Sequence, residues 1–266
     1  GTLLAMPVVN VFGFIHHSRY LPDRRDLNRC FPGSESGSLG ARTARVFKEM
    51  VLDHATHGID LHTGAIHRSN LPQVRANLDN PEVAELAHAF GVPVVMHSDL
   101  REGSLRETAD ADGVPVITYE AGEALRYDES CVRAGLRGVV NVMRHLEMVR
   151  ARPRKPRKAQ VARSSSWVRA DHDGVFRSLV ALGRYVRAGD CIGRISDPFG
   201  TTEQDVLASF DGILVGRNNL PLVHEGEALF NIARYEGGED LERAVENFQN
   251  KLENSTGSED EPPIAP

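Results

Sequence analysis

The chain has 266 residues, of which 41% are hydrophobic and 26% are charged, and its formal net charge is -6. This length suits one large domain or two smaller ones, and the composition is that of an ordinary globular protein. No apolar run approaches the ~20 residues that a membrane helix needs, so we do not expect a membrane-spanning protein. The three cysteines, Cys30, Cys131 and Cys191, are too widely spaced for a disulfide framework or a zinc knuckle, which favours a reducing, cytoplasmic location.

Residues 1–150 alternate apolar strands with helical stretches. Strands are predicted at Leu3–Val11, Gly58–Leu61, Val92–Met96 and Val114–Tyr119. Helices are predicted at Leu39–Asp53, Glu82–Phe90, Ser104–Ala111 and Glu129–Glu147. Strands separated by helices of this length indicate an α/β fold with a mostly parallel sheet flanked by helices. Ligands bind such sheets beyond the carboxyl ends of the strands, so candidate site residues are sought there.

The start of the chain is unusual. The run Leu3–Val11 is almost continuously apolar, which is typical of a buried strand inside a parallel sheet. It lacks the basic start and the small-residue cleavage site of a signal peptide. Because a protein rarely begins with its own central strand, we expect further residues upstream of Gly1.

Three segments follow the α/β domain of residues 1–150. Residues 151–160 are rich in Arg, Lys and Pro without interleaved aromatic residues, so we interpret them as a basic linker rather than a nucleic-acid patch. Residues 161–235 contain short apolar segments separated by Gly and Asp, which predicts a small all-β domain similar to the barrel-sandwich domains of lipoyl and biotinyl carriers. Their hairpin-tip lysine has no counterpart here, so we expect a structural or oligomerising role. Residues 236–266 carry nine acidic and two basic residues and are predicted to form an acidic, partly disordered tail.

An arginine-rich loop runs from Ser18 to Gly33. It contains four arginines, among them Arg19 and Arg29, and the latter follows Asn28. A guanidinium binds a carboxylate through two parallel hydrogen bonds, so this loop can hold a carboxylate. The alternative is a solvated surface loop with local salt bridges.

Two polar residues stand at predicted strand ends. His62 follows the strand at Gly58–Leu61, a position from which its imidazole can ligate a metal, although a lone histidine is often structural. Glu120 follows the strand at Val114–Tyr119 and suits a general base or acid, or equally a structural carboxylate. Together with the arginine loop, these residues suit metal-assisted hydrolysis of an acyl group on a substrate that bears a carboxylate.

Three motifs carry a resemblance to a known family. They are Asp26-Leu-Asn-Arg29, Asp60-Leu-His62 and Tyr119-Glu-Ala-Gly122, in this order. At these residues the sequence resembles the succinylglutamate desuccinylase/aspartoacylase family, relatives of the zinc carboxypeptidases. The resemblance covers most of residues 1–150, and the β domain that follows also matches the family architecture. It implies a zinc-carboxypeptidase-like fold, one Zn²⁺ per subunit, and hydrolysis of the amide bond of an N-acyl amino acid or a related small carboxylate.

The resemblance also implies roles for five residues. His62 looks like the family's third zinc ligand. Glu120 looks like the carboxylate that takes a proton from the attacking water and passes it to the leaving amine. Asn28 and Arg29 look like the clamp on the substrate carboxylate, and Arg19 looks like the arginine that polarises the scissile carbonyl.

One family motif is absent from the expected place. The family takes its first two zinc ligands from a His-x-x-Glu motif ahead of the first strand seen here, and residues 1–150 contain no such motif. A catalytic zinc site needs three protein ligands. We therefore expect the other metal ligands to be missing, the chain alone to be inactive, and the motif to lie upstream of Gly1.

Other functions stay open. The first is a non-catalytic carboxylate-binding or scaffold protein with a dismantled metal site, and the second is a carboxypeptidase-like peptidase. The expected partner is a small N-acyl amino acid, with no nucleic acid and no membrane, and the β domain makes a homo-oligomer possible.

Overall fold

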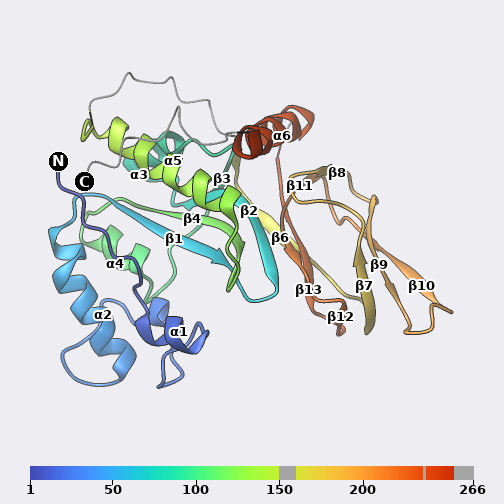
Figure 1. The fold of residues 1–266 in the computed structure, drawn as a ribbon, viewed down its shortest axis with the longest axis horizontal. Coiled ribbons are helices and arrows are strands. Elements are labelled where there is room, and N and C mark those ends of the chain that lie inside the picture. Colours follow the sequence, from blue (N-terminus) through green and yellow to red (C-terminus); the bar gives the residue numbers. More distant parts are fainter. Residues whose placement is uncertain (150–159, 236–237, 255–266) are drawn as a thin grey trace.

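The computed structural model describes residues 1–149, 160–235 and 238–254. Figure 1 shows an α/β part, which holds the blue and green elements, beside a smaller all-β part in yellow and orange. The predicted basic linker lies outside the described residues except for Gln160, and so does the end of the predicted tail.

The helices and strands have the following bounds. The helices are α1 (Val11–His16), α2 (Leu39–Met50), α3 (Pro81–Phe90), α4 (Leu105–Ala111), α5 (Glu129–His145) and α6 (Gly238–Asn254), with short 3-10 helices η1 (Leu27–Arg29) and η2 (Leu52–His54). The strands are β1 (Gly58–Gly64), β2 (Arg68–Ala76), β3 (Val94–His97), β4 (Val116–Glu123), β5 (Gln160–Ala162), β6 (Ser165–Arg169), β7 (Gly174–Ser178), β8 (Tyr185–Val186), β9 (Cys191–Ser196), β10 (Glu203–Leu207), β11 (Gly212–Asn218), β12 (Leu222–Val223) and β13 (Ala228–Ala233).

A large sheet of nine strands runs through both parts of the molecule. Its main path is β1-β4-β2-β11-β13-β6, and β3, β5 and β8 join beside it. In the α/β part, β1 pairs with β4, β2 with β3 and β3 with β5 in parallel, whereas β2 runs antiparallel to β4. The predicted α/β fold with a mostly parallel, helix-flanked sheet is confirmed.

Strand β2 links the two parts. Its residues Arg68 to Asn70 pair with β11 of the all-β part, whereas its residues Gln73 to Ala76 pair with β3 of the α/β part. The pairing of β2 with β4 shifts in register between Asn70 and Gln73, and Pro72 lies inside this irregularity. One strand therefore holds both halves of the sheet in register.

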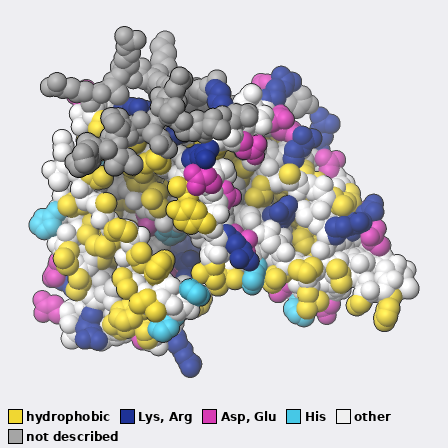
Figure 2. All heavy atoms as spheres, in the orientation of Figure 1, with side chains coloured by type: hydrophobic (Ala, Val, Ile, Leu, Met, Phe, Trp, Pro, Cys, Tyr) yellow, Lys and Arg dark blue, Asp and Glu magenta, His cyan; other side chains and the backbone are white. Residues whose placement is uncertain are grey.

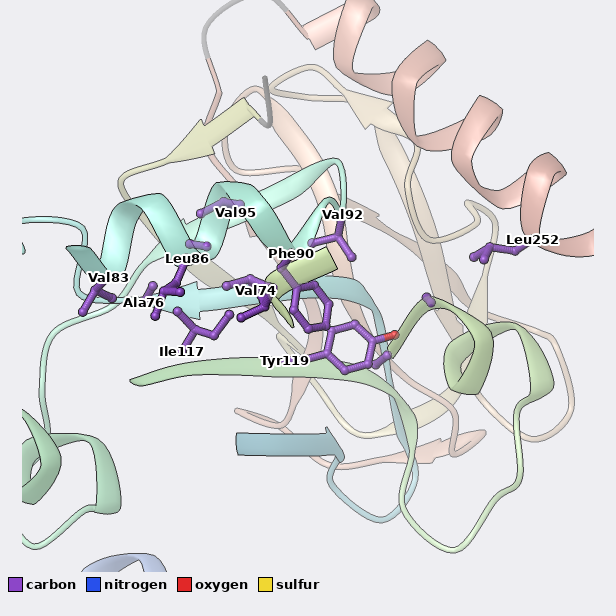
Figure 3. Close-up of a cluster of buried hydrophobic side chains, with 14 residues drawn as sticks. Val74, Ala76, Val83, Leu86, Phe90, Val92, Val95, Ile117, Tyr119 and Leu252 are labelled. Atoms are coloured by element: carbon purple, nitrogen blue, oxygen red, sulfur yellow. The ribbon is translucent and has the colours of Figure 1, made fainter. Parts of the chain in front are cut away.

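Helices α3 and α5 cover one face of the α/β sheet (Figure 1). Their apolar side chains pack on β2 and β4 in a core that includes Val74, Phe90 and Ile117 (Figure 3). The Phe90 and Tyr119 rings lie 5.0 Å apart between centroids, within the range of favourable aromatic pairs. Gly138 of α5 leaves the space for Phe90, since a Cβ there would approach the ring to 2.1 Å. This packing holds β4, the strand that carries Glu120, in place from the face of the sheet that the helices cover.

The all-β part is a two-layer sandwich. A separate antiparallel sheet, β10-β9-β7-β12, faces β11 and β13 of the large sheet. Phe176, Ile195, Leu214 and Phe230 belong to the core between them. The predicted barrel-sandwich-like domain is present in this form.

The predicted strand at Leu3–Val11 is wrong. Residues 1–10 form no strand, α1 begins at Val11, and Leu3 and Leu4 are 58% and 50% exposed. A buried strand needs a neighbouring strand and cover on both faces, and residues 1–10 have no strand partner among the described residues. An apolar run alone is therefore not enough to place a strand.

Helix α6 replaces the first half of the predicted tail. Asp240, Glu246 and Glu253 are exposed, whereas three apolar residues of the helix are buried, namely Leu241, Val245 and Leu252. Leu252 joins the core under α5, and Leu241 joins a core at the junction of β3, β5 and β11. The segment has a net negative charge, but its apolar residues repeat at helical spacing and form a stripe along one face of the helix.

No helix in the described ranges is both long and apolar enough to cross a membrane. The three cysteines carry free thiols.

We predict that Leu241→Ala lowers the free energy of unfolding by about 3 kcal/mol, because it leaves a cavity where α6 meets the sheet. Urea unfolding followed by circular dichroism measures this change. Asn250→Ala, at an exposed position of the same helix, is the matched control and changes the free energy of unfolding by less than about 0.5 kcal/mol. Equal effects of the two substitutions would contradict the docking of α6.

Candidate active site

A polar cavity of about 320 Å³ opens where β1 and β4 end and β2 begins. Figure 2 shows a hollow in this face, with histidine and basic side chains in it and hydrophobic side chains around it. The cavity brings together five residues singled out from the sequence, namely Arg19, Asn28, Arg29, His62 and Glu120. Its other lining residues are Thr63, Gly64, Ala65, Arg68, Asn70, Arg75, Ser98, Arg101, Ser104, Arg106, Thr118 and Trp167.

His62 lies on β1 directly opposite Glu120 on β4. Its Nε2 is 2.7 Å from Oδ2 of Asp60, and its Nδ1 has no hydrogen-bond partner among the described residues. Burial acts to lower the pKa of His62, but the hydrogen bond to Asp60 and the charges of Asp60 and Glu120 outweigh it and raise the pKa above its ordinary value. The carboxylate of Asp60 therefore orients the imidazole and stabilises its protonated form.

Glu120 is held by one hydrogen bond and one ion pair, both from residues of β2. Asn70 donates a hydrogen bond from Nδ2 to Oε2 at 2.8 Å, and Nε of Arg75 lies 3.3 Å from Oε1. The Glu120 side chain is 19% exposed and faces the cavity. Both carboxylate oxygens thus have a fixed orientation, which a proton acceptor needs.

Gly64 explains how β1 turns back toward β2 beside these residues. A Cβ at this position would lie 2.1 Å from the carbonyl oxygen of Arg68 and 2.8 Å from that of Gly122. A residue with a side chain could not occupy this place without moving the backbone, so glycine is required for the close approach of the three strands.

Strand register orders the cavity floor into rows. One row contains Asp60, Thr118 and Arg75, and the next contains His62, Glu120 and Gln73. Successive rows on one face lie roughly 7 Å apart, two residues along the strand. Beyond the second row, Asn70 pairs with Gly122 on one side and Gly216 on the other. His62 and Glu120 therefore lie between the Arg75 end and the Asn70 end of the floor.

The arginine loop forms one wall of the cavity. Nε and Nη2 of Arg19 contact Oδ2 of Asp26 at 3.0 and 2.9 Å, while the other Asp26 oxygen accepts from the backbone of Asn28. The Arg19 side chain is 53% exposed, so this ion pair mainly orients the guanidinium and contributes little stability. Nη1 of Arg19 has no partner among the described residues.

Asn28 and Arg29 connect this loop to α4. Oδ1 of Asn28 accepts a hydrogen bond of 2.9 Å from the backbone N–H of Leu105, the first residue of α4. The Asn28 Nδ2 has no hydrogen-bond partner in the described ranges. Arg29 is exposed at the cavity and donates from Nη1 to the Asn28 carbonyl. The pair therefore presents donors to the cavity from an anchored position.

Arg106 is a site residue that the sequence reasoning missed. Its guanidinium donates to the Ser98 carbonyl, the Ser98 hydroxyl and the Asp99 carbonyl at 3.1–3.2 Å. Burial and the neighbouring charge of Arg75 lower the pKa of Arg106. Arg106 stands in the first turn of α4, where a positive charge opposes the helix dipole. A basic residue in the first turn of a predicted helix is therefore the sequence feature that could have identified Arg106.

The sequence reasoning also missed four other residues that line the cavity, namely Arg68, Asn70, Arg75 and Trp167. The first three lie on β2, which reads as a loop because it is polar and contains Pro72. Trp167 lies on β6 of the all-β part, and the Arg68 guanidinium carbon is 5.1 Å from the centre of its indole ring. The polar face of a strand that lines a cavity does not have the alternation by which strands are recognised.

The described residues do not complete a zinc site. A catalytic zinc ion takes three protein ligands, and within the described ranges no group of three His, Cys, Asp or Glu side chains could hold a metal ion. His62 alone has a suitable arrangement, since Asp60 supports its Nε2 as a carboxylate supports a metal-ligating histidine.

The chain contains one His-x-x-Glu spacing, His224 to Glu227, outside residues 1–150. Glu227 accepts from the backbone N–H of His224, and the His224 side chain is 66% exposed. Both residues belong to the turn between β12 and β13 and neither lines the cavity. This spacing closes a turn and does not supply the missing ligands.

The chain is similar to a known protein family and to a relative of known activity. Residues 1–146 match the family model of the succinylglutamate desuccinylase/aspartoacylase catalytic domain. The chain is 28% identical over 247 residues to the N-alpha-acetyl-L-2,4-diaminobutyric acid deacetylase of Halomonas elongata. The matched region covers 88% of this chain and 72% of that protein.

Two solved structures have a similar fold. The succinylglutamate desuccinylase/aspartoacylase of Rhodobacter sphaeroides has a TM-score of 0.76 and 24% identity, covering 87% of this chain and 74% of its own. The product-bound ectoine utilization protein EutE (DoeB) of Ruegeria pomeroyi has a TM-score of 0.76 and 22% identity, covering 85% and 73%. At these identities the structures support the fold alone.

Proposed function

Because residues 1–146 of 266 match its catalytic domain, the chain belongs to the succinylglutamate desuccinylase/aspartoacylase family, and from this premise we propose that it hydrolyses the amide bond of an N-acyl amino acid. A hydrolase role fits the deacylase relative of Halomonas elongata, which acts on an N-acetyl amino acid by its name. The observation that carries the proposal is the pairing of His62 with Glu120 on the floor of an arginine-lined cavity.

In this proposal, Asn28 and Arg29 bind the carboxylate of the amino acid. Arg29 supplies the charge, and the Asn28 side chain supplies a neutral donor whose position is fixed by α4. The arginine loop then directs the amide bond toward the floor of the cavity.

Glu120 accepts a proton from the attacking water and returns it to the leaving amine. Asn70 and Arg75 keep its two oxygens oriented throughout. Arg19 stabilises the negative charge that develops on the carbonyl oxygen, and loss of one such donor typically slows turnover ~10²–10³-fold.

We also propose a zinc ion at His62. Such an ion lowers the pKa of a bound water to about 7 and polarises a carbonyl. His62 is the one ligand that the described residues offer, so further ligands would have to come from outside them. The zinc content and amine release of the chain, and of any longer product of its gene, test the proposal on N-acetyl and N-succinyl amino acids.

A second candidate is a carboxylate-binding protein without turnover. The incomplete metal site within the described residues favours it. Absence of zinc and of turnover in every product of the gene, with carboxylate binding retained, would establish this candidate and overturn the hydrolase.

We predict that His62→Ala lowers the zinc content of the zinc-binding product at least tenfold, since a metal site that loses one of three ligands loses most of its affinity. Inductively coupled plasma mass spectrometry after gel filtration measures it. His67→Ala, at the nearby exposed histidine, is the control and leaves the zinc content unchanged. Stoichiometric zinc in His62→Ala would remove His62 as a ligand.

For Glu120→Gln we expect unchanged zinc content and a kcat reduced at least ~100-fold, because the amide cannot accept the proton. Steady-state amine release gives kcat. Glu123→Gln on the same strand lies outside the cavity lining and retains near-normal kcat. A normal kcat for Glu120→Gln would exclude it as the proton acceptor.

Arg29→Gln is expected to raise KM about tenfold or more for substrates with a free α-carboxylate, because a charge-assisted hydrogen bond is lost. The matched α-carboxamide substrates lack this contact, so their KM stays the same. An equal rise for both substrate sets would contradict the clamp.

A further inference from the structure

One wall of the cavity is formed by residues 64–68, where β1 turns back into β2, and by Trp167 of β6. From this turn, Gly64, Ala65 and Arg68 line the cavity. The guanidinium carbon of Arg68 lies 5.1 Å from the centre of the Trp167 ring, within the ~6 Å of a cation–π contact. Arg68 therefore covers one face of the indole, and the two parts of the molecule meet in this wall.

The register of the large sheet places Trp167 beside the turn. Trp167 pairs with Asn231, Asn231 with Gly216, and Gly216 with Asn70, so these residues form one row across four strands. A Cβ at Gly216 would lie 3.4 Å from Cη2 of Trp167 and 3.1 Å from Oδ1 of Asn70. Because Gly216 has no side chain, the indole ring reaches across β11 toward β2.

The turn contains a residue in a strained conformation. His67 has a φ of 64°, in the left-handed region that residues other than glycine rarely adopt. Its side chain is 50% exposed, so burial contributes little to holding it. Both of its backbone groups are bonded instead. The N–H donates to Oε1 of Glu123 at 3.1 Å, and the carbonyl accepts from the N–H of Asn219 at 2.7 Å.

The Asn219 side chain reinforces the same turn. Its Nδ2 donates to Oγ of Ser69 at 2.6 Å and to Oε2 of Glu123 at 2.9 Å. Asn219 directly follows β11, so these bonds join the all-β part to the start of β2 and the end of β4. His67 and Ser69 are the two chain neighbours of Arg68, and both are bonded to Asn219.

The direction of the Asn219 amide is set by its partners. A carboxylate such as that of Glu123 can only accept hydrogen bonds, so the amide faces it with the nitrogen. Arg217 can only donate, and its Nε lies 3.3 Å from the amide oxygen Oδ1. An exchange of donor and acceptor at the Asn219–Glu123 contact is therefore a specific test of this bond.

We propose that Asn219 is a positioning residue, which fixes Arg68 and through it the wall of the cavity. This inference rests on the proposed function, because it gives the wall a part in binding the N-acyl amino acid. Asn219 is exposed, so its hydrogen bonds act on the turn without contributing to either core. Glu120 is held by other residues, on β2. Loss of the Asn219 contacts thus acts on substrate binding rather than on proton transfer.

Two readouts on the full chain test this role. Acrylamide quenching of Trp167, the one tryptophan of the chain, measures how well Arg68 covers the indole. Isothermal titration calorimetry measures the dissociation constant of N-acetylglycine. In Asn219→Asp a carboxylate faces Glu123, and the two charges repel each other. We expect quenching to increase and the dissociation constant to rise about fivefold, the effect of losing one neutral hydrogen bond.

A second substitution distinguishes this bond from a general loss of structure. When Asn219→Asp is combined with Glu123→Gln, the new amide donates to the new carboxylate, and its oxygen still accepts from the backbone of His67. Quenching and the dissociation constant then return to within about twofold of the unaltered chain. Asn250→Asp adds the same charge at an exposed position of α6 and, as the matched control, changes neither quantity. Circular dichroism confirms that each variant folds.

The outcomes separate this inference from the function on which it rests. Unchanged quenching and binding in Asn219→Asp overturn the inference. An effect that the double variant does not reverse also overturns it, because the hydrogen bond is then not the cause. Increased quenching with unchanged binding overturns the role in binding and leaves the proposed function intact. Absence of binding to the unaltered chain overturns the carboxylate clamp of the proposed function together with the inference.

Discussion

The backbone pairing of β2 is the constraint on which the rest of the structure depends. One edge of this strand pairs with β4, and the other is divided between β3 and β11. The first half of β2 therefore belongs to the sheet of the all-β part and the second half to that of the α/β part. Asn70 and Arg75, one from each half, hold Glu120. The appended sandwich is for this reason part of the frame of the cavity.

The cavity concentrates positive charge. Six arginines line it, against Glu120 as the one lining carboxylate. Arg106 is stabilised by neutral carbonyl and hydroxyl groups rather than by a carboxylate, and its lowered pKa reflects its cost of burial. Such an arrangement costs stability in the free protein and is offset when an anion binds. In the proposed function, specificity for carboxylates follows from charges that the protein does not neutralise itself.

Elements whose apolar residues repeat regularly could be predicted from the sequence. Elements whose structure depends on neighbours distant in the sequence could not. Strands β1, β3 and β4 and helices α2 to α5 were recognised because their apolar residues repeat at strand or helix spacing. Strand β2 was missed because its cavity face is polar, and the Leu3–Val11 run was misplaced because burial depends on neighbours that a sequence does not display. The five residues to which the family resemblance gave roles share one cavity in the structure. Trp167 could not have been foreseen, since its place follows from pairing across four strands.

Helix α6 has a consequence for the biogenesis of the protein. Leu252 completes the core under α5, and Leu241 completes the core at the junction of the two parts. Synthesis proceeds from the N-terminus, so neither core can close until residues near the end of the described chain have emerged from the ribosome. Until then the nascent polypeptide exposes apolar surface from both parts. Docking of α6 is therefore a late step in the folding of these two cores, and chains that lack this helix expose apolar surface that chaperones and proteases recognise.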